Sequence, residues 1–308
     1  MTPAYDELPR HAALGLPHSW GLLDPELGTL SRASHQDVRD AAHAVMSGEP
    51  VSLNLSLGLI DPPLFGRPAA RHRVHAADRN TFEDVLDDFN PQAASQWDGF
   101  RHVRAREAGF YGGVTDLDAA GPGRLSIERL ADRGIVGRGV LLDVAGWFEG
   151  RGDPWDPMAG DVVEAATLGQ VAGDQGTHLR SGDILCIRLG WVAAYRALSE
   201  PRRAEPLVEQ RFSGVRADEA TARFLWDSGV AAVVTDNPAV EAAPGNREDG
   251  SLHRRLLPML GVVMGELFDL DALAVRCSER RRHDFLFVAA PLPIPAGLSS
   301  PANAMAIL

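Results

Sequence analysis

The 308-residue chain is 45% hydrophobic and 23% charged, so it can bury a full core and still carry a polar surface. Its formal net charge of -12 argues against nucleic acid and anionic membranes as partners and favours a small molecule. The sequence contains no lysine, which excludes Schiff-base and phosphate-loop chemistry because both need a primary amine.

The first predicted elements are a helix, a strand and a loop. Ser34 caps a helix over residues 35–47, which has one apolar face and ends at Gly48. Alternating apolar residues then predict a strand over 50–57. The stretch 61–71 is rich in proline and arginine and is expected to be an ordered loop.

The rest of the chain alternates between short apolar runs typical of strands and the periodicity typical of helices. Alternation of this kind predicts one α/β domain over residues 1–308, in which residues 1–33 form an N-terminal arm. Short apolar runs predict strands at 139–144, 183–189, 230–235, 261–264 and 285–289. Helical periodicity falls at 161–169, 218–228, 252–260 and 270–280.

Several features favour a cytoplasmic location. Residues 1–10 contain acidic residues and prolines, whereas a secretory signal begins with basic residues and an apolar stretch. No apolar run approaches the roughly 20 residues that span a bilayer. Cys186 and Cys277 are the only cysteines, and they are interpreted as buried thiols in a reducing compartment.

One short segment concentrates polar residues of the types used in catalysis. If Gln96 to Asp98 is extended, Gln96 and Asp98 project to one side while Trp97 points to the core. His102 can return to the same wall if the chain turns after Asp98. The segment contains Gln92, Ser95, Gln96, Trp97, Asp98 and His102.

Two further candidates lie near the end of the chain. Glu266 follows the predicted strand 261–264 in an apolar stretch, where a carboxylate is costly to bury unless it is paired, protonated or bound to a metal. His253 stands near the start of a helical pattern. The alternative for Glu266 is a structural hydrogen bond to backbone or arginine.

The chain resembles the cyclase family, which includes bacterial kynurenine formamidases and isatin hydrolases, and specifically its longer branch. The family motif H-x-G-T-H-x-D-x-P-x-H has the same length as the segment 92–102. Asp98 matches the ligand aspartate, and His102 matches the histidine assigned to acid/base work. Further matching segments are Ser19-Trp20-Gly21, Gly137 to Asp143, Gly182 to Trp191, Asp236-Asn237-Pro238, His253 to Glu266 and Ser300 to Ala304.

The resemblance implies a cyclase-type, swivelling β/β/α-like single domain with a mixed central sheet, assembled as a homodimer or homotetramer. The chain departs from the motif because glutamines occupy both positions of its histidine ligands, Gln92 and Gln96. An amide oxygen suits hard ions such as magnesium, manganese or calcium better than zinc. The expected ligands of a divalent manganese, magnesium or zinc ion are Asp98, Gln92, Gln96, His253 and Glu266, and a site without a metal is the alternative.

Three hypotheses follow. The first is metal-assisted hydrolysis of a carbon–nitrogen bond in a small cyclic amide, formamide or related carbonyl compound, with His102 and Asp98 as catalytic residues. The second is a metal-independent cyclase or dehydratase, a lyase, in which Gln92 and Gln96 donate to an oxyanion. The third is a ligand-binding homologue without catalysis.

Overall fold

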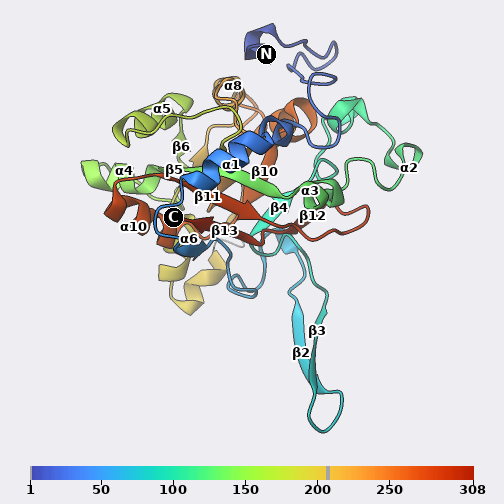
Figure 1. Ribbon diagram of the computed structural model, residues 1–308, viewed down its shortest axis with the longest axis vertical. Helices are drawn as coiled ribbons and strands as arrows, with labels where there is room; N and C mark the ends of the chain where they lie inside the picture. The colour runs from blue at the N-terminus through green and yellow to red at the C-terminus, as the bar shows by residue number, and fades with distance from the viewer. Residues whose placement is uncertain (1, 206–208) are drawn as a thin grey trace.

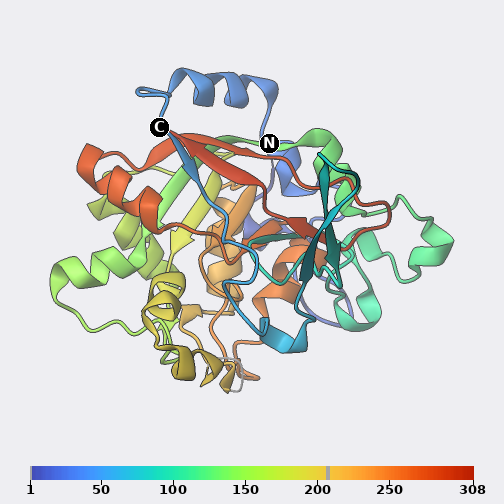
Figure 2. The same ribbon diagram turned by 90° about the horizontal axis from the view of Figure 1, so that it is seen from below.

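The computed structural model describes residues 2–205 and 209–308. A large mixed sheet runs through the centre of the molecule, and helices cover it on both sides (Figures 1 and 2). The strand order across this nine-stranded sheet is β1-β13-β11-β5-β7-β9-β10-β4-β12. Its strands are β1 (Pro50–Ser52), β4 (Gln96–Asp98), β5 (Ile135–Asp143), β7 (Ile184–Arg188), β9 (Ala232–Thr235), β10 (Val263–Glu266), β11 (Asp284–Ala289), β12 (Ser299–Pro301) and β13 (Ala304–Ile307).

The middle of the sheet is parallel and its flanks are antiparallel. Strands β5, β7, β9 and β10 pair in parallel, while β4 joins β10 in the antiparallel sense and β11 joins β5 in the same way. Strands β7 and β9 are almost continuously apolar and buried, as expected for strands covered on both faces. A mixed α/β sheet was predicted, and the structure confirms it.

The helices lie between these strands in the sequence and pack on the two faces of the sheet. Helix α1 lies across β5 and β11 on one face (Figure 2). The α-helices are α1 (His35–His43), α2 (Leu117–Ala120), α3 (Ile127–Arg133), α4 (Val144–Arg151), α5 (Ala165–Asp174), α6 (Trp191–Ala197), α8 (Glu219–Asp227), α9 (Leu252–Arg254) and α10 (Asp271–Arg280). The π-helix η7 (Arg255–Leu260) continues α9, and short 3-10 turns lie at Tyr5–Glu7, Thr29–Arg32, Leu64–Gly66, Arg106–Ala108, Tyr111–Gly113 and Glu200–Ala204.

Two small sheets lie outside the central one. Strands β2 (Arg71–Ala76) and β3 (Phe82–Asp87) form a hairpin that projects from the body (Figure 1). The short strands β6 (Val162–Val163) and β8 (Gly214–Val215) pair in parallel. The sequence reading missed both sheets.

Two predicted elements need correction. The helix expected over 161–169 is wrong at its start, because Val162–Val163 pair with β8 and helix α5 begins only at Ala165. The strand expected over 50–57 ends at Ser52, the last residue with a partner in β13. The other predicted strands and helices are confirmed, with ends that differ by a few residues.

Strand β4 links the core to the candidate site. Trp97 is fully buried and packs edge-on against Phe268 and Phe287, with ring centroids 5.1 and 6.0 Å away. Since successive side chains alternate across a strand, Gln96 and Asp98 project to the opposite side from Trp97. The predicted extended conformation of this segment is therefore confirmed.

Candidate active site

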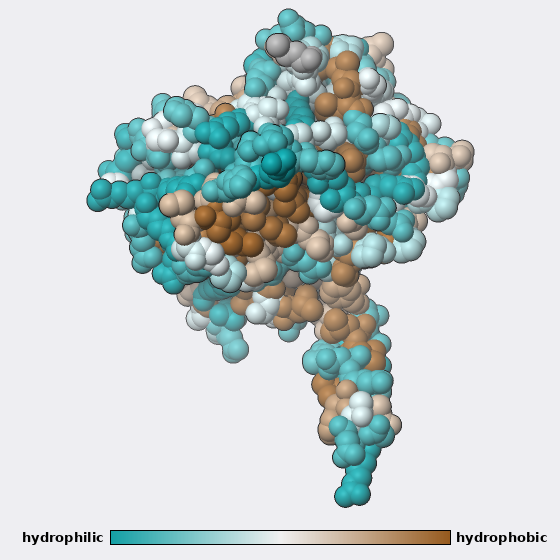
Figure 3. All heavy atoms as spheres, in the orientation of Figure 1, coloured by the Kyte–Doolittle hydropathy of each residue, from teal (hydrophilic) through white to brown (hydrophobic). Residues whose placement is uncertain are grey.

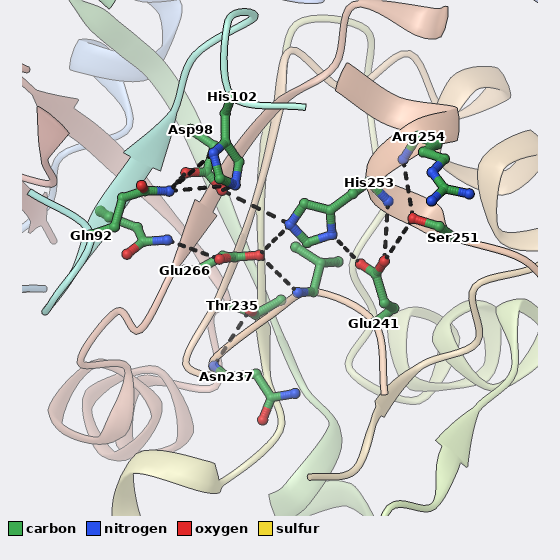
Figure 4. Close-up of polar contacts among 12 residues, drawn as sticks. Gln92, Asp98, His102, Thr235, Asn237, Glu241, Ser251, His253, Arg254 and Glu266 are labelled. Atoms are coloured by element: carbon green, nitrogen blue, oxygen red, sulfur yellow. Dashed lines mark hydrogen bonds and ion pairs between the residues drawn. The ribbon is translucent and has the colours of Figure 1, made fainter. Parts of the chain in front are cut away.

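Neighbouring strands bring the two distant carboxylates together. Gln96 lies opposite Glu266 in the register between β4 and β10, and Asp98 lies opposite Met264. The chain turns after Asp98, where the His102 amide donates to the Gly99 carbonyl at 3.0 Å, so His102 returns to the same wall. Helix α9 supplies His253 from the other side (Figure 4).

Asp98 lies at the centre of this group and is fully buried. Its Oδ1 accepts a hydrogen bond from Gln92 Nε2 at 2.8 Å. Its Oδ2 is also buried and has no hydrogen-bond partner among the described residues. This oxygen lies 3.9 Å from His102 Nε2 and 3.9 Å from His253 Nε2.

A divalent ion would fit this arrangement. Asp98, His102 and His253 each offer one ligand atom, and these atoms lie within 4.8 Å of one another. A buried carboxylate oxygen without a partner is costly, and a cation beside it would remove that cost. The donor set of two imidazoles and one carboxylate suits zinc, manganese and other first-row ions.

His253 lies between two carboxylates. Its Nδ1 is 2.6 Å from Glu241 Oε2, and its Nε2 is 3.0 Å from Glu266 Oε1. Although burial opposes protonation, Glu241 and Glu266 together raise the pKa of His253 well above its ordinary value. The same ion pair holds the pKa of Glu241 below its usual range despite burial of that carboxyl group.

Glu266 is buried and accepts several hydrogen bonds. Gln96 Nε2 donates to its Oε2 at 3.0 Å, and the Val240 amide donates to its Oε1 at 3.2 Å. Burial raises the pKa of Glu266 to about 7, against the lowering effect of His253 and with a further rise from Asp98. Near neutral pH this carboxyl group therefore exchanges a proton readily.

The glutamines present nitrogen rather than oxygen to the carboxylates. Gln92 Nε2 faces Asp98 and also lies 3.3 Å from His102 Nδ1, while Gln96 Nε2 faces Glu266. Gln96 Oε1 faces Arg67 Nη1 at 3.4 Å. The structure thus brings all six predicted site residues together. The group of three that could hold an ion, however, contains His102, which was not an expected ligand, and neither of the two glutamines.

His102 has the properties of a proton-transfer residue. Its side chain is 25% exposed, and burial is the main cause that lowers its pKa below the ordinary value. His253 and Arg67 lower the pKa further, and Asp98 opposes them. The imidazole is therefore neutral near pH 7 and can accept a proton.

The sequence reading missed two contributors to the site. Glu241 follows the Asp236-Asn237-Pro238 segment, and its pairing with His253 depends on a loop that periodicity does not place. Arg67 lies in the proline-rich loop and donates to the Gln92 carbonyl at 2.5 Å. Burial lowers the pKa of Arg67, and Asp98 and Glu266 oppose that shift.

Other residues near the motif are structural. Arg101 is buried and donates to the main-chain carbonyls of Arg124 and Gly121 at 2.6 and 2.8 Å, so it does not face the site as a free guanidinium. Phe100 and Tyr111 pack against each other in the core. These residues play the structural roles that burial predicts for them.

The chain matches a known family model and several solved structures. The family model Cyclase, described as "Putative cyclase", matches residues 41–242. A crystal structure titled as that of a novel cyclase is 26% identical, with a TM-score of 0.82, and the match covers 94% of this chain and 99% of the other. No curated protein matches the chain.

More distant structures share the fold. An isatin hydrolase bound to the product analogue thioisatinate is 14% identical, with a TM-score of 0.59 over 89% of this chain and 99% of that one. A predicted metal-dependent hydrolase from Bacillus stearothermophilus is 15% identical, with a TM-score of 0.51 over 84% and 97% of the two chains. These likenesses confirm the expected fold. Within the described residues, the longest apolar helices fall short of a membrane-spanning length.

Proposed function

Because the chain belongs to the cyclase family, we propose that it is a hydrolase that opens a carbon–nitrogen bond in a small cyclic amide, formamide or related carbonyl compound. The observation that carries the proposal is the position of His102 and His253 beside the buried Oδ2 of Asp98. This oxygen has no hydrogen-bond partner in the described chain. The isatin hydrolases and the predicted metal-dependent hydrolase, which share the fold, support the reaction class.

Asp98 and His253 would hold a divalent ion, while His102, beside the same carboxylate, stays free for proton transfer. When bound, such an ion polarises a carbonyl group and lowers the pKa of a coordinated water. His253 must lose its proton to become a ligand, and Glu266, whose pKa is about 7, lies 3.0 Å away to receive it. Glu241 stays hydrogen bonded to the other ring nitrogen and fixes the orientation of the imidazole.

Proton transfer during hydrolysis needs a neutral base that water can reach. His102 meets this need because it is partly exposed and neutral near pH 7. We assign His102 the transfer of a proton between water and the leaving nitrogen. Asp98 Oδ2, which lies 3.9 Å from the rings of both His102 and His253, keeps the ion beside this base.

A second function is supported by the orientation of the glutamine amides. The N–H groups of Gln92 and Gln96 point into the cluster, and such groups can stabilise a developing oxyanion without a metal. A metal-independent cyclase or dehydratase would use His102 and Asp98 as its acid and base. A ligand-binding homologue without catalysis is the third candidate.

Assay of the purified protein against isatin and a panel of cyclic amides and formamides, with and without a chelator, distinguishes these functions. The proposal predicts turnover that chelation abolishes and that added manganese or zinc restores. H102A should lower kcat by about 10²–10⁴-fold, the usual contribution of a general acid–base group. H178A, a change of an exposed histidine elsewhere, should leave kcat unchanged. Full turnover after complete removal of metal would favour the lyase, and no turnover on any substrate would favour the ligand-binding protein.

A further inference from the structure

A hollow of about 280 Å³ close to the candidate active site is lined by arginines. The guanidinium groups belong to Arg106, Arg247, Arg254 and Arg255. None of the four forms an ion pair with any carboxylate among residues 2–205 and 209–308, although the whole chain has a net charge of -12. Such a concentration of unpaired positive charge in an acidic protein attracts anions.

One of these arginines is held in place with part of its hydrogen-bonding capacity unused. Arg255 donates from Nε to the Ala217 carbonyl at 3.3 Å and from Nη2 to the Asp249 carbonyl at 3.2 Å. Its Nη1 is buried and has no partner in the described part of the chain. Guanidinium groups match the geometry of carboxylate and phosphate oxygens, often in bidentate pairs.

The lining also includes apolar and hydroxyl groups. Leu14 and Leu16 also line the hollow, so a ligand with an apolar part fits better than a bare ion. Ser251 belongs to the same lining and lies with its Oγ 3.5 Å from Glu241 Oε1. Glu241 in turn contacts His253, so a chain of contacts joins the hollow to the candidate active site (Figure 4).

We propose that this hollow binds a small organic anion through a carboxylate or phosphate group. The ligand would be the charged end of a substrate or a separate effector. A substrate and an effector would each present a carboxylate or phosphate group to the arginines. The proposal does not depend on the reaction class, because it rests on the lining residues alone.

Calorimetric titration with benzoate and with inorganic phosphate, at constant ionic strength set by sodium chloride, tests the proposal. Benzoate should bind with a Kd of about 1 mM or tighter, and the double variant R247A/R254A should weaken binding at least tenfold. R39A, in which an exposed arginine of α1 is lost, should bind as the wild type does. Absence of saturable binding by either probe, or equal binding by R247A/R254A, would overturn the site.

Competition distinguishes the two sources. If benzoate inhibits turnover competitively, the hollow receives the charged end of the substrate. If benzoate changes kcat without competing, the hollow binds an effector. Both results support the site, and the titration stands even when no substrate of the enzyme is found.

Discussion

Replacement of Gln92 by leucine tests whether Asp98 is a buried charge that depends on one amide. Asp98 is fully buried, and Gln92 Nε2 donates a hydrogen bond to its Oδ1 at 2.8 Å. In Q92L this donor disappears while the shape of the side chain is nearly kept. The donation from Arg67 to the Gln92 carbonyl is a main-chain contact and survives the change.

The expected loss can be estimated from that geometry. A hydrogen bond to a charged group contributes about 1.5–3 kcal/mol, and a buried acceptor that loses its partner costs at least as much. We therefore expect the free energy of unfolding of Q92L to fall by about 2–3 kcal/mol in protein treated with a chelator. Added manganese or zinc should recover part of the loss, because a cation beside Asp98 Oδ2 replaces the missing donor.

The chain offers a matched control for this measurement. Gln36 Nε2 donates to Asp40 Oδ1 at 2.7 Å on the exposed surface of α1, so the same pair of groups meets in water. Q36L should change the free energy of unfolding by less than about 0.5 kcal/mol. Urea titration followed by tryptophan fluorescence measures both variants. Equal effects of Q92L and Q36L would show that the Asp98 carboxylate does not depend on Gln92.

Three further outcomes are expected. Q92H/Q96H restores imidazoles at the motif positions. Since zinc binding of about 10–16 kcal/mol is shared among four ligands, its zinc affinity should rise at least a hundredfold, as measured by competition with a chromophoric chelator. Burial raises the pKa of Asp236 to about 7, so its carboxyl group takes up a proton on folding and stability should fall as pH rises from 4 to 7. In urea titrations, D236N should reduce that slope by up to about 1.4 kcal/mol per pH unit. An unchanged slope would contradict the assignment. W97A removes a fully buried ring and should lower stability by about 3–5 kcal/mol.

Local patterns were sufficient for most of the central sheet. Strands β7 and β9 are buried on both faces, so their sequences are short apolar runs, and helices α8 and α10 show clear amphipathic spacing. The hairpin of β2 and β3 was missed because charged residues are frequent in both strands and every position in them is exposed or only partly buried. Figure 3 shows scattered hydrophobic residues along this projecting arm, where they are open to water.

The candidate site was predictable only in part, for a physical reason. Alternation along β4 predicted that Gln96 and Asp98 share one side, and the cost of a buried carboxylate singled out Glu266. Neither pattern indicates which strands are neighbours, so the meeting of β4 with β10 rested on the resemblance. Glu241 and Arg67 belong to irregular loops, where no periodicity relates a residue to its partner.

The charges of the cluster couple the binding of a divalent cation to the protonation of Glu266. Asp98, Glu241 and Glu266 all lie near the imidazolium of His253, and the Arg67 guanidinium also acts on Asp98 and Glu266, so three acidic groups face two positive charges. The raised pKa of Glu266 follows from this imbalance together with burial, because a proton on Glu266 removes one negative charge. A divalent cation at Asp98 would remove the same excess and would lower that pKa. Cation binding should therefore release protons, and a titration in buffers of different ionisation enthalpy would detect their release.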